Sequence, residues 1–193
     1  MRKGEGKRRL LAQARALIAA EGFRAATPER LAAEVKGPSA RQVQRHFSDQ
    51  AALVRAVLDD LGADTFPVPD SDGMPPDPAG QLQVLLDSYL AAAREPTLGF
   101  QVLLRALVEL TDADHRAELT AVLLEYTEPL VHLLMAGQQA GVFRRLDAQV
   151  AAWELIQAIL GYALTGPRDV AISEVDPAPP FETLLHGLLK TDV

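Results

Sequence analysis

The stretch TPERLAAEVKGPSARQVQRHF, residues 27–47, predicts two short helices joined by a tight turn. Thr27 before Pro28 marks a helix start, because the hydroxyl accepts a backbone N–H that the helix leaves unpaired and proline occupies a position that needs none. Gly37-Pro38 ends this helix, since glycine adopts left-handed φ and proline restricts the residue before it. Ser39 then offers the cap of a second helix.

The second helix has one apolar face and one polar face. Helical spacing places Ala40, Val43 and Phe47 on the apolar face. The polar face carries Arg41, Gln42, Gln44 and Arg45. These side chains have donors and acceptors that match guanine and adenine edges in a DNA major groove. A solvated polar helix has a similar composition, but the short glycine turn and the buried seam on both helices are typical of a helix-turn-helix.

The charge of the chain is divided between its two ends. The whole chain has a formal net charge of -7, which by itself argues against nucleic acid. Residues 1–60, however, hold 12 Lys and Arg against 7 Asp and Glu, a net of +5, so the remainder has 7 against 19, a net of -12. The predicted helix-turn-helix therefore lies in the basic part, as expected for a surface that meets phosphates.

Composition excludes several other classes of protein. Cysteine is absent, which excludes disulfides, thiol catalysis and thiolate metal sites. No secretion signal is visible at the N-terminus, and no apolar run approaches the ~20 residues that a bilayer requires. The four His fall in no metal-ligand spacing, and no motif of a hydrolase, metalloprotease or phosphate-binding loop is present. We expect a cytoplasmic protein without a cofactor, which is not an enzyme and does not enter a membrane.

The rest of the chain reads as helical, with no strand pattern or internal repeat. Residues 1–9 are basic and are expected to form a mobile arm. Helices are predicted for about 7–21, 49–61, 81–94 and 98–110, for one long segment 112–141 kinked at Pro129, and for 147–165 and 181–189. Residues 62–80 contain five prolines and three glycines and predict a loop. We therefore expect a head at 1–61, a loop at 62–80 and a helical body at 81–193.

The N-terminal part contains Gly22-Phe23, Thr27, Leu31-Ala32, Gly37, Ser39, His46-Phe47 and Leu53, in an order and mostly at spacings that match a known family pattern. Through these residues it resembles the TetR family of bacterial transcriptional regulators. The resemblance covers residues 7–60 specifically and the remainder loosely, through helix count and the stretch GVFRRLDAQVAA. The resemblance implies an all-α fold of about nine helices, with a three-helix DNA-binding head, a linking fourth helix, a ligand-binding body and a dimer formed by the last two long helices.

Carried over to this chain, the resemblance implies a set of DNA-binding residues. They are Thr27, Lys36, Ser39, Arg41, Gln42, Gln44, Arg45 and His46. Thr27 and His46 would position the backbone, while Gln42 and Gln44 are the best candidates to read bases. The chain departs from the family pattern in one extra residue near Lys36, in Gln44 where tyrosine is common, in Arg41 where glycine is common, and in Asp49 where lysine often begins the next helix.

The body supplies two further groups of candidates. Polar tips within apolar helices are typical of ligand sites, and they occur at Tyr89, Phe100, Arg105, Tyr126, His132, Trp153 and Gln157, although such residues are more often ordinary packing. Dimerisation is predicted for the last helices through Val150, Trp153, Ile156, Leu160, Leu164, Leu184, Leu185 and Leu188.

The sequence predicts a homodimeric repressor that binds a palindromic operator in double-stranded DNA. A small molecule in the C-terminal part would change its operator affinity. The alternative is a helical module that binds a ligand or a protein and has lost sequence-specific DNA binding.

Overall fold

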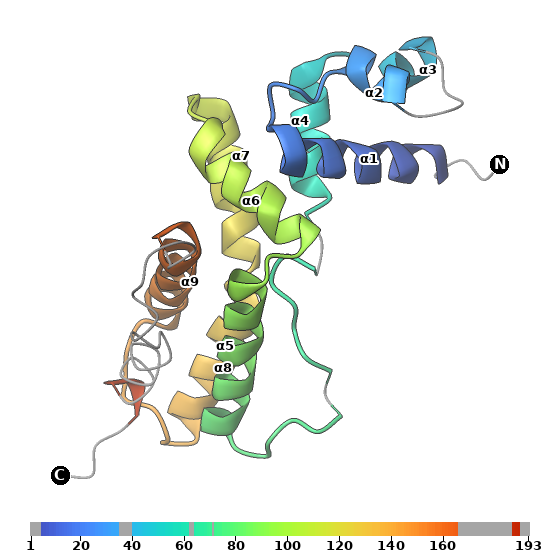
Figure 1. The fold of residues 1–193 in the computed structure, drawn as a ribbon. Helices are drawn as coiled ribbons and strands as arrows, with labels where there is room; N and C mark the ends of the chain where they lie inside the picture. Colours follow the sequence, from blue (N-terminus) through green and yellow to red (C-terminus); the bar gives the residue numbers. More distant parts are fainter. Residues whose placement is uncertain (1–4, 35–39, 62–63, 71, 166–186, 190–193) are drawn as a thin grey trace. The chain divides into compact units, whose positions relative to one another are not determined.

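The computed structural model of the chain describes residues 5–34, 40–61, 64–70, 72–165 and 187–189. Within these residues the fold is all-helical, as predicted, and the one β-type contact is an isolated antiparallel bridge between Phe143 and Leu189 (Figure 1). The helices are α1 (Glu5–Glu21), α2 (Pro28–Glu34), α3 (Ala40–His46), α4 (Gln50–Asp59), α5 (Pro78–Arg94), α6 (Leu98–Glu109), α7 (Ala113–Glu125), α8 (Glu128–Gln139) and α9 (Ala148–Thr165).

Packing divides the chain into two compact units. Unit 1 consists of Met1–Thr65 and Pro96–Leu123, and it contains α1 to α4, α6 and most of α7. Unit 2 consists of Phe66–Glu95 and Leu124–Val193, and it contains α5, α8 and α9. The domain boundaries predicted at residues 61 and 81 stay a prediction. They divide the chain into domains that fold separately, and the packing of the folded chain does not test this. The packing adds that unit 1 is built from two separate stretches of chain.

Unit 1 is organised around α1. Its apolar positions follow helical spacing, and α1 packs against α6, α4 and α2. The buried residues of α1 include Leu10, Leu11, Ala14, Leu17 and Ile18. Helix α2 packs against α3, with Leu31 fully buried between them and their neighbours. These contacts give the helix-turn-helix a rigid support.

Two helix starts differ from those predicted. Helix α4 begins at Gln50, one residue later than predicted, because Asp49 caps it: the Asp49 carboxylate accepts the Ala52 N–H at 2.8 Å, and the Ser48 hydroxyl donates to that carboxylate at 2.9 Å. Helix α5 begins at Pro78, earlier than the predicted Gln81, because Asp77 caps it by accepting the Gly80 N–H at 2.8 Å. The proline-rich composition of the preceding loop concealed this start, although proline at a first helical position is favoured.

In unit 2, helices α5, α8 and α9 lie side by side and each contacts the other two. The predicted single helix over 112–141 is wrong. The structure has α7 and α8 with Tyr126 and Thr127 between them, and Pro129 lies in the first turn of α8, where its missing N–H breaks no helical hydrogen bond. Proline therefore acts as a start signal here and not as a kink.

Other predictions concern the ends of the chain and the turn of the helix-turn-helix. The mobile arm predicted for 1–9 is wrong for residues 5–9, which already belong to α1. The turn at 35–39, most of the helix predicted at 181–189, and residues Leu184 and Leu185 lie outside the described residues. Among the described helices none is by itself long and apolar enough to cross a membrane; only α7 and α8 taken together reach that length and composition.

Candidate nucleic-acid interface

Helix α3 separates its apolar and polar faces cleanly. Val43 and the following Phe47 are buried, with 0% and 1% of their surface exposed. Arg41, Gln44 and Arg45 are exposed. Among the described residues, neither arginine of α3 has an ion-pair partner. Three of the residues predicted to read DNA, Arg41, Gln44 and Arg45, are therefore presented to solvent.

The arginine of α2 differs from those of α3. Arg30 forms an ion pair with Glu34 at 2.7 Å and another with Glu21 at 2.8 Å, and these carboxylates raise the pKa of the guanidinium. Arg15 of α1 is likewise paired with acidic residues of its own unit. The basic excess of the N-terminal part thus overstates the positive charge that is available to phosphates.

Thr27 and His46 lie at the ends of the helix pair. The Thr27 hydroxyl accepts the Arg30 N–H at 3.2 Å, so it caps the first turn of α2 as its sequence position indicates. His46 is exposed, and its ring lies 6.3 Å from the ring of Phe47, centroid to centroid. Of the remaining predicted DNA-binding residues, Lys36, Ser39 and the side chain of Gln42 lie outside the described residues.

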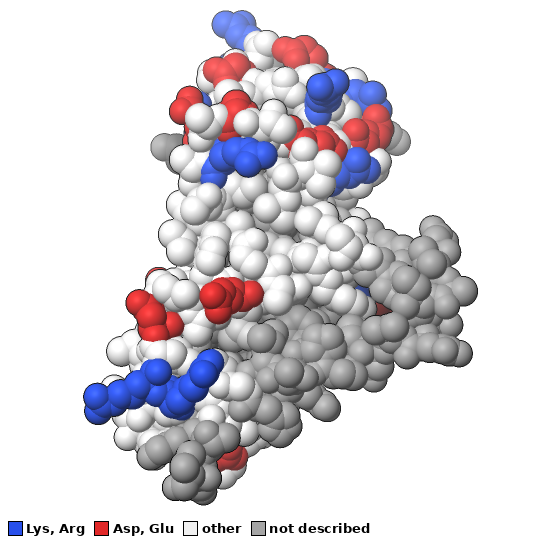
Figure 2. Space-filling model, turned by 90° about the vertical axis from the view of Figure 1, so that its left-hand side faces the viewer, with Lys and Arg blue, Asp and Glu red and all other residues white. Residues whose placement is uncertain are grey.

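A further set of exposed cations lies on the first turns of α1. Lys7, Arg8 and Arg9 are exposed there, and sequence reasoning had placed them in an arm. The helix predicted from about residue 7 also included these residues, and the structure begins α1 two residues earlier, at Glu5. On the face drawn in Figure 2 the basic and acidic side chains are interspersed, so that face is not marked by charge as a broad nucleic-acid surface.

The start of α4 carries a negative charge. The Ala52 backbone N–H and the Ser48 hydroxyl lower the pKa of the Asp49 carboxyl, which holds it ionised. A helix N-terminus attracts anions, but here the attached carboxylate already occupies the N–H groups that would meet a phosphate. The Ala52 N–H at this helix start is therefore already bonded to a carboxylate of the chain itself.

In unit 2 the structure brings two predicted ligand residues to the same aromatic ring. The ring of Phe66 lies 4.9 Å from that of Tyr89 and 5.1 Å from that of Tyr126, centroid to centroid. Tyr89 is fully buried, and its hydroxyl has no hydrogen-bond partner among the described residues. Burial, with a contribution from Tyr126, raises the pKa of that hydroxyl. Sequence reasoning missed Phe66, because it immediately precedes Pro67 in a segment read as a loop.

The other predicted ligand residues are distributed over both units. Phe100 and Arg105 belong to unit 1, where Arg105 pairs with Glu109 at 3.1 Å. His132 on α8 and Gln157 on α9 are exposed, and Trp153 is half-buried. A groove of about 460 Å³ in unit 2 runs between α8 and the start of α9 and is lined by residues including Met135, Leu146 and Gln149, none of them predicted.

The predicted dimerisation residues of α9 fall into two groups. Val150 and Leu164 are exposed by 53% and 48%, respectively, and Trp153 is half-buried. Ile156 and Leu160 are buried within unit 2. Leu188, outside α9, is buried as well. A substitution at a buried position would disturb the packing of unit 2 as well as any association. The dimer hypothesis is therefore best tested at Val150 and Leu164, the exposed stripe of α9.

Comparisons with known proteins place the fold. No family model and no curated protein sequence matches the chain. A candidate transcriptional regulator from Saccharomonospora viridis, solved in complex with choline, has a TM-score of 0.75 at 21% identity and covers 98% of this chain and 100% of its own. The superantigen PfiT has a TM-score of 0.72 at 21% identity, covering 99% and 98%. A TetR transcriptional regulator from Chloroflexus aurantiacus has a TM-score of 0.69 at 24% identity, covering 97% and 94%.

These identities are all below 25%, so they establish architecture and not activity. The structural similarity extends over nearly the full length of each chain. The chain has the fold of the TetR-family transcriptional regulators.

Proposed function

We propose that this protein is a homodimeric, ligand-responsive transcriptional regulator that binds a palindromic operator as a repressor. The observation that carries the proposal is the division of α3, which buries Val43 and exposes Arg41, Gln44 and Arg45. A helix that enters a DNA groove must be held by a second helix through a buried apolar seam, so that its polar face is presented to the bases. A helix that is merely solvated needs no such support.

Helix α3 would lie in the major groove. There an arginine pairs with guanine and a glutamine with adenine, in each case through two hydrogen bonds. Each such two-bond pair is worth about 1–3 kcal/mol of discrimination against the wrong base. The exposed cations of α1, which include Lys7 and Arg8, would meet phosphates and strengthen binding to all sequences alike. Base reading and phosphate contact are separable, because only the second changes the salt dependence of affinity.

The dimer would form across the exposed stripe of α9. Val150 and Leu164 lie on this stripe, and between them Gly161 has open space where a side chain would be. A glycine flanked by exposed apolar residues lets a partner helix approach closely. A two-fold dimer would place its two α3 helices in successive major grooves, about 34–36 Å apart or a multiple of that.

The effector would bind in unit 2 beside Tyr89. A buried hydroxyl without a partner costs free energy that a ligand with a complementary polar group would recover. To act as a switch, that ligand must favour one arrangement of the dimer over another. Choline is the first probe to test, because aromatic faces attract quaternary ammonium groups and the Saccharomonospora viridis protein was solved with it.

The test is a selection from sheared genomic DNA of the source organism at moderate salt, followed by sequencing of the retained fragments. An enriched palindrome that the wild type retains, and that Gln44→Ala and Arg45→Ala lose or change, is the expected result. Arg144→Ala serves as the matched control, because Arg144 is an exposed arginine of unit 2. The contrary result is protein that is folded and dimeric but enriches no sequence, either with or without choline. In that case the proposal of a DNA-binding regulator is replaced by the alternative of a ligand- or protein-binding module.

A further inference from the structure

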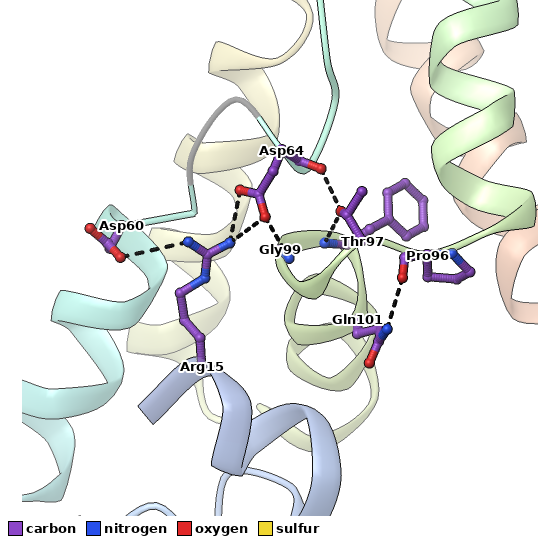
Figure 3. A network of polar contacts seen from close by, with 8 residues as sticks. Arg15, Asp60, Asp64, Pro96, Thr97, Gly99 and Gln101 are labelled. Carbon is purple, nitrogen blue, oxygen red and sulfur yellow. Dashed lines mark hydrogen bonds and ion pairs between the residues drawn. The ribbon is translucent and has the colours of Figure 1, made fainter. Parts of the chain in front are cut away.

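Asp64 holds three segments of unit 1 together (Figure 3). Its two carboxylate oxygens accept hydrogen bonds from Nη2 of Arg15 on α1, at 2.8 Å and 2.7 Å. Oδ2 also accepts the N–H of Gly99 in the first turn of α6, at 3.0 Å. The backbone carbonyl of Asp64 accepts the hydroxyl of Thr97, the cap of α6. Asp60, at the end of α4, adds a longer ion pair to Arg15 at 3.8 Å.

The contact is tightly packed. A Cβ atom at position 99 would lie 2.5 Å from Oγ1 of Thr65, 2.8 Å from Nη2 of Arg15 and 2.9 Å from Oδ1 of Asp64. Only glycine fits at this approach. The side chain of Arg15 is 14% exposed and that of Asp64 is 42% exposed, so the pair is covered on the arginine side and open to water on the aspartate side. The hydrogen bonds between them are short and charge-assisted, which makes them stronger than neutral ones.

The chain path explains why this position matters. The chain leaves unit 1 after Thr65, forms α5 in unit 2, and returns at Pro96, two residues before α6 begins. Asp64 and Thr97 therefore stand beside the two successive crossings, and the hydrogen bond between them ties the crossings together. A displacement of α5 that is transmitted along the chain reaches Thr97 just before α6, and therefore pulls on the hydrogen bond between Thr97 and Asp64.

Helix α6 is tied to the α1 region at its other end as well. The Glu109 carboxylate accepts the N–H of Phe23, just after α1, at 2.7 Å. Arg105 donates to the carbonyl of Ala20 in α1 at 3.4 Å. Because α6 is held at both ends, it moves with α1 for as long as both ties are intact. Helix α1 in turn packs against α2 and α4, and α2 packs against α3.

We propose that Asp64 is the positioning residue that couples α6 to the helix-turn-helix, so that displacement of the α5–α6 connection changes the placement of α3 on DNA. The inference rests on the proposed function for its DNA readout, but the coupling itself is a property of unit 1. Asp64 touches no base or phosphate in this scheme. It acts through Arg15 and Gly99.

The first test measures affinity for the operator fragment recovered by genomic selection. Asp64→Asn should weaken binding about tenfold, the equivalent of one charge-assisted contact. The change adds positive charge, which by itself would strengthen binding to DNA. Asp59→Asn supplies the matched control, because Asp59 is an exposed aspartate at the end of α4 and adds the same charge. An equal loss in both variants would overturn the proposal.

A double-mutant cycle distinguishes coupling between Arg15 and Asp64 from a general contribution of Asp64 to stability. Arg15→Gln and Asp64→Asn break the same link, so the double variant should bind DNA about as well as either single variant. A general loss of stability would lower the melting temperature of each variant and leave the affinity of the folded protein unchanged. Additive losses of affinity would show that the two residues act separately. If Asp64→Asn does not fold, Thr97→Val removes the tie between the crossings together with the cap of α6, leaves the Arg15–Asp64 pair in place, and should still lower affinity.

A second test needs no DNA. Hydrogen exchange followed by mass spectrometry should show faster exchange in Asp64→Asn both in α6 residues 98–104 and in α1 residues 10–21, while Asp59→Asn matches the wild type. Faster exchange in α6 alone would overturn the coupling. If the wild type enriches no operator, the proposed function fails and this exchange result still decides the coupling. If the wild type binds its operator and Asp64→Asn binds equally well, the coupling fails and the proposed function stands.

Discussion

The Glu109 carboxylate lies directly over Gly22 while it accepts the backbone N–H of Phe23 at 2.7 Å. Gly22 has a φ of +87°, and a Cβ at this position would lie 2.6 Å from both carboxylate oxygens. The end of α1 therefore needs glycine for two independent reasons, its backbone conformation and the close approach of α6. The contact also explains why Gly22-Phe23 stands out in the sequence.

Gly22→Ala should lower the melting temperature more than Gly141→Ala does. Gly141 has a φ of +75° and nothing within 4 Å of a Cβ, so its substitution should lose only the stability that the left-handed conformation costs an alanine, about 1–2 kcal/mol. Gly22→Ala should lose the same amount and must also displace Glu109. Thermal unfolding followed by circular dichroism measures the difference. Equal losses in the two variants would mean that Glu109 moves aside freely.

Substitutions on the DNA-binding face should separate into two kinds. Arg41→Ala and Gln42→Ala should alter the preference among operator sequences, because these side chains are assigned to base edges. Lys36→Ala should weaken all sequences alike and reduce the salt slope by about 1, as expected for one phosphate contact. Binding titrations on operator and mismatched duplexes at several salt concentrations test both. An unchanged preference in Gln42→Ala would remove that residue from the base readers.

Tyr89→Phe should leave the free protein equally stable or more stable. The wild type buries a hydroxyl without a partner among the described residues, at a typical cost of about 1–3 kcal/mol, and phenylalanine has nearly the same shape. Burial raises the pKa of this hydroxyl, so it stays protonated at neutral pH and is available as a donor. Chemical denaturation measures the stability. A clear loss would mean that the hydroxyl is bonded in solution, which would remove the argument for an effector beside it.

Charged substitutions on α9 should discriminate interface from core. Val150→Glu or Leu164→Glu should give folded monomer in sedimentation experiments, because both side chains are about half exposed. Leu160 is 2% exposed, and Leu160→Glu should instead lower the melting temperature by burying a charge. Dimers that persist in both exposed variants would move the interface away from α9.

The start of α7 should show an acid-sensitive contribution to stability. The His115 backbone N–H, together with its ring 2.6 Å away, lowers the pKa of the Asp112 carboxyl below its ordinary value of 3.8. The stabilisation is therefore complete above about pH 3.8 and is lost as the pH falls through the lowered, folded-state pKa.

Melting temperatures of the wild type and of Asp112→Ala should accordingly differ at pH 6 and converge in stronger acid. Asp72→Ala, at an exposed loop position, is the control and should show no such convergence. A difference that stays constant with pH would show that the cap acts without its charge.

The sequence predicted the elements that local chemistry determines. Helix ends are indicated by Thr27-Pro28, Asp147 and Gly141, because the hydrogen bonds and backbone conformations at these positions involve only near neighbours in the chain. Asp147 indeed accepts the N–H groups of Gln149 and Val150, at 2.9 Å and 3.1 Å. The same kind of reasoning misplaced Pro129, because a proline after a polar stretch is compatible with either a kink or a start. Only the packing of α8 decides between them.

The candidate site was less accessible to sequence reasoning, because it depends on partners that are distant in the chain. Nothing near Arg15 indicates that Asp64 will bind it, since the two are separated by 49 residues. Phe66 gave no periodic signal, yet its ring brings Tyr89 and Tyr126 together. Periodicity likewise placed Leu160 on an apolar helix without showing whether the apolar neighbour belongs to the same chain.

The discontinuous build of unit 1 limits how this protein can be divided. Cutting the chain at residue 61 would strip α6 from α1 and leave apolar side chains such as Leu17 and Phe23 without part of their cover. Such a fragment is expected to aggregate when expressed alone, and its grafting onto a foreign body would fail for the same reason. Specificity would therefore be exchanged between relatives by replacing the surface residues of α3 within an intact chain, and not by shuffling whole N-terminal segments.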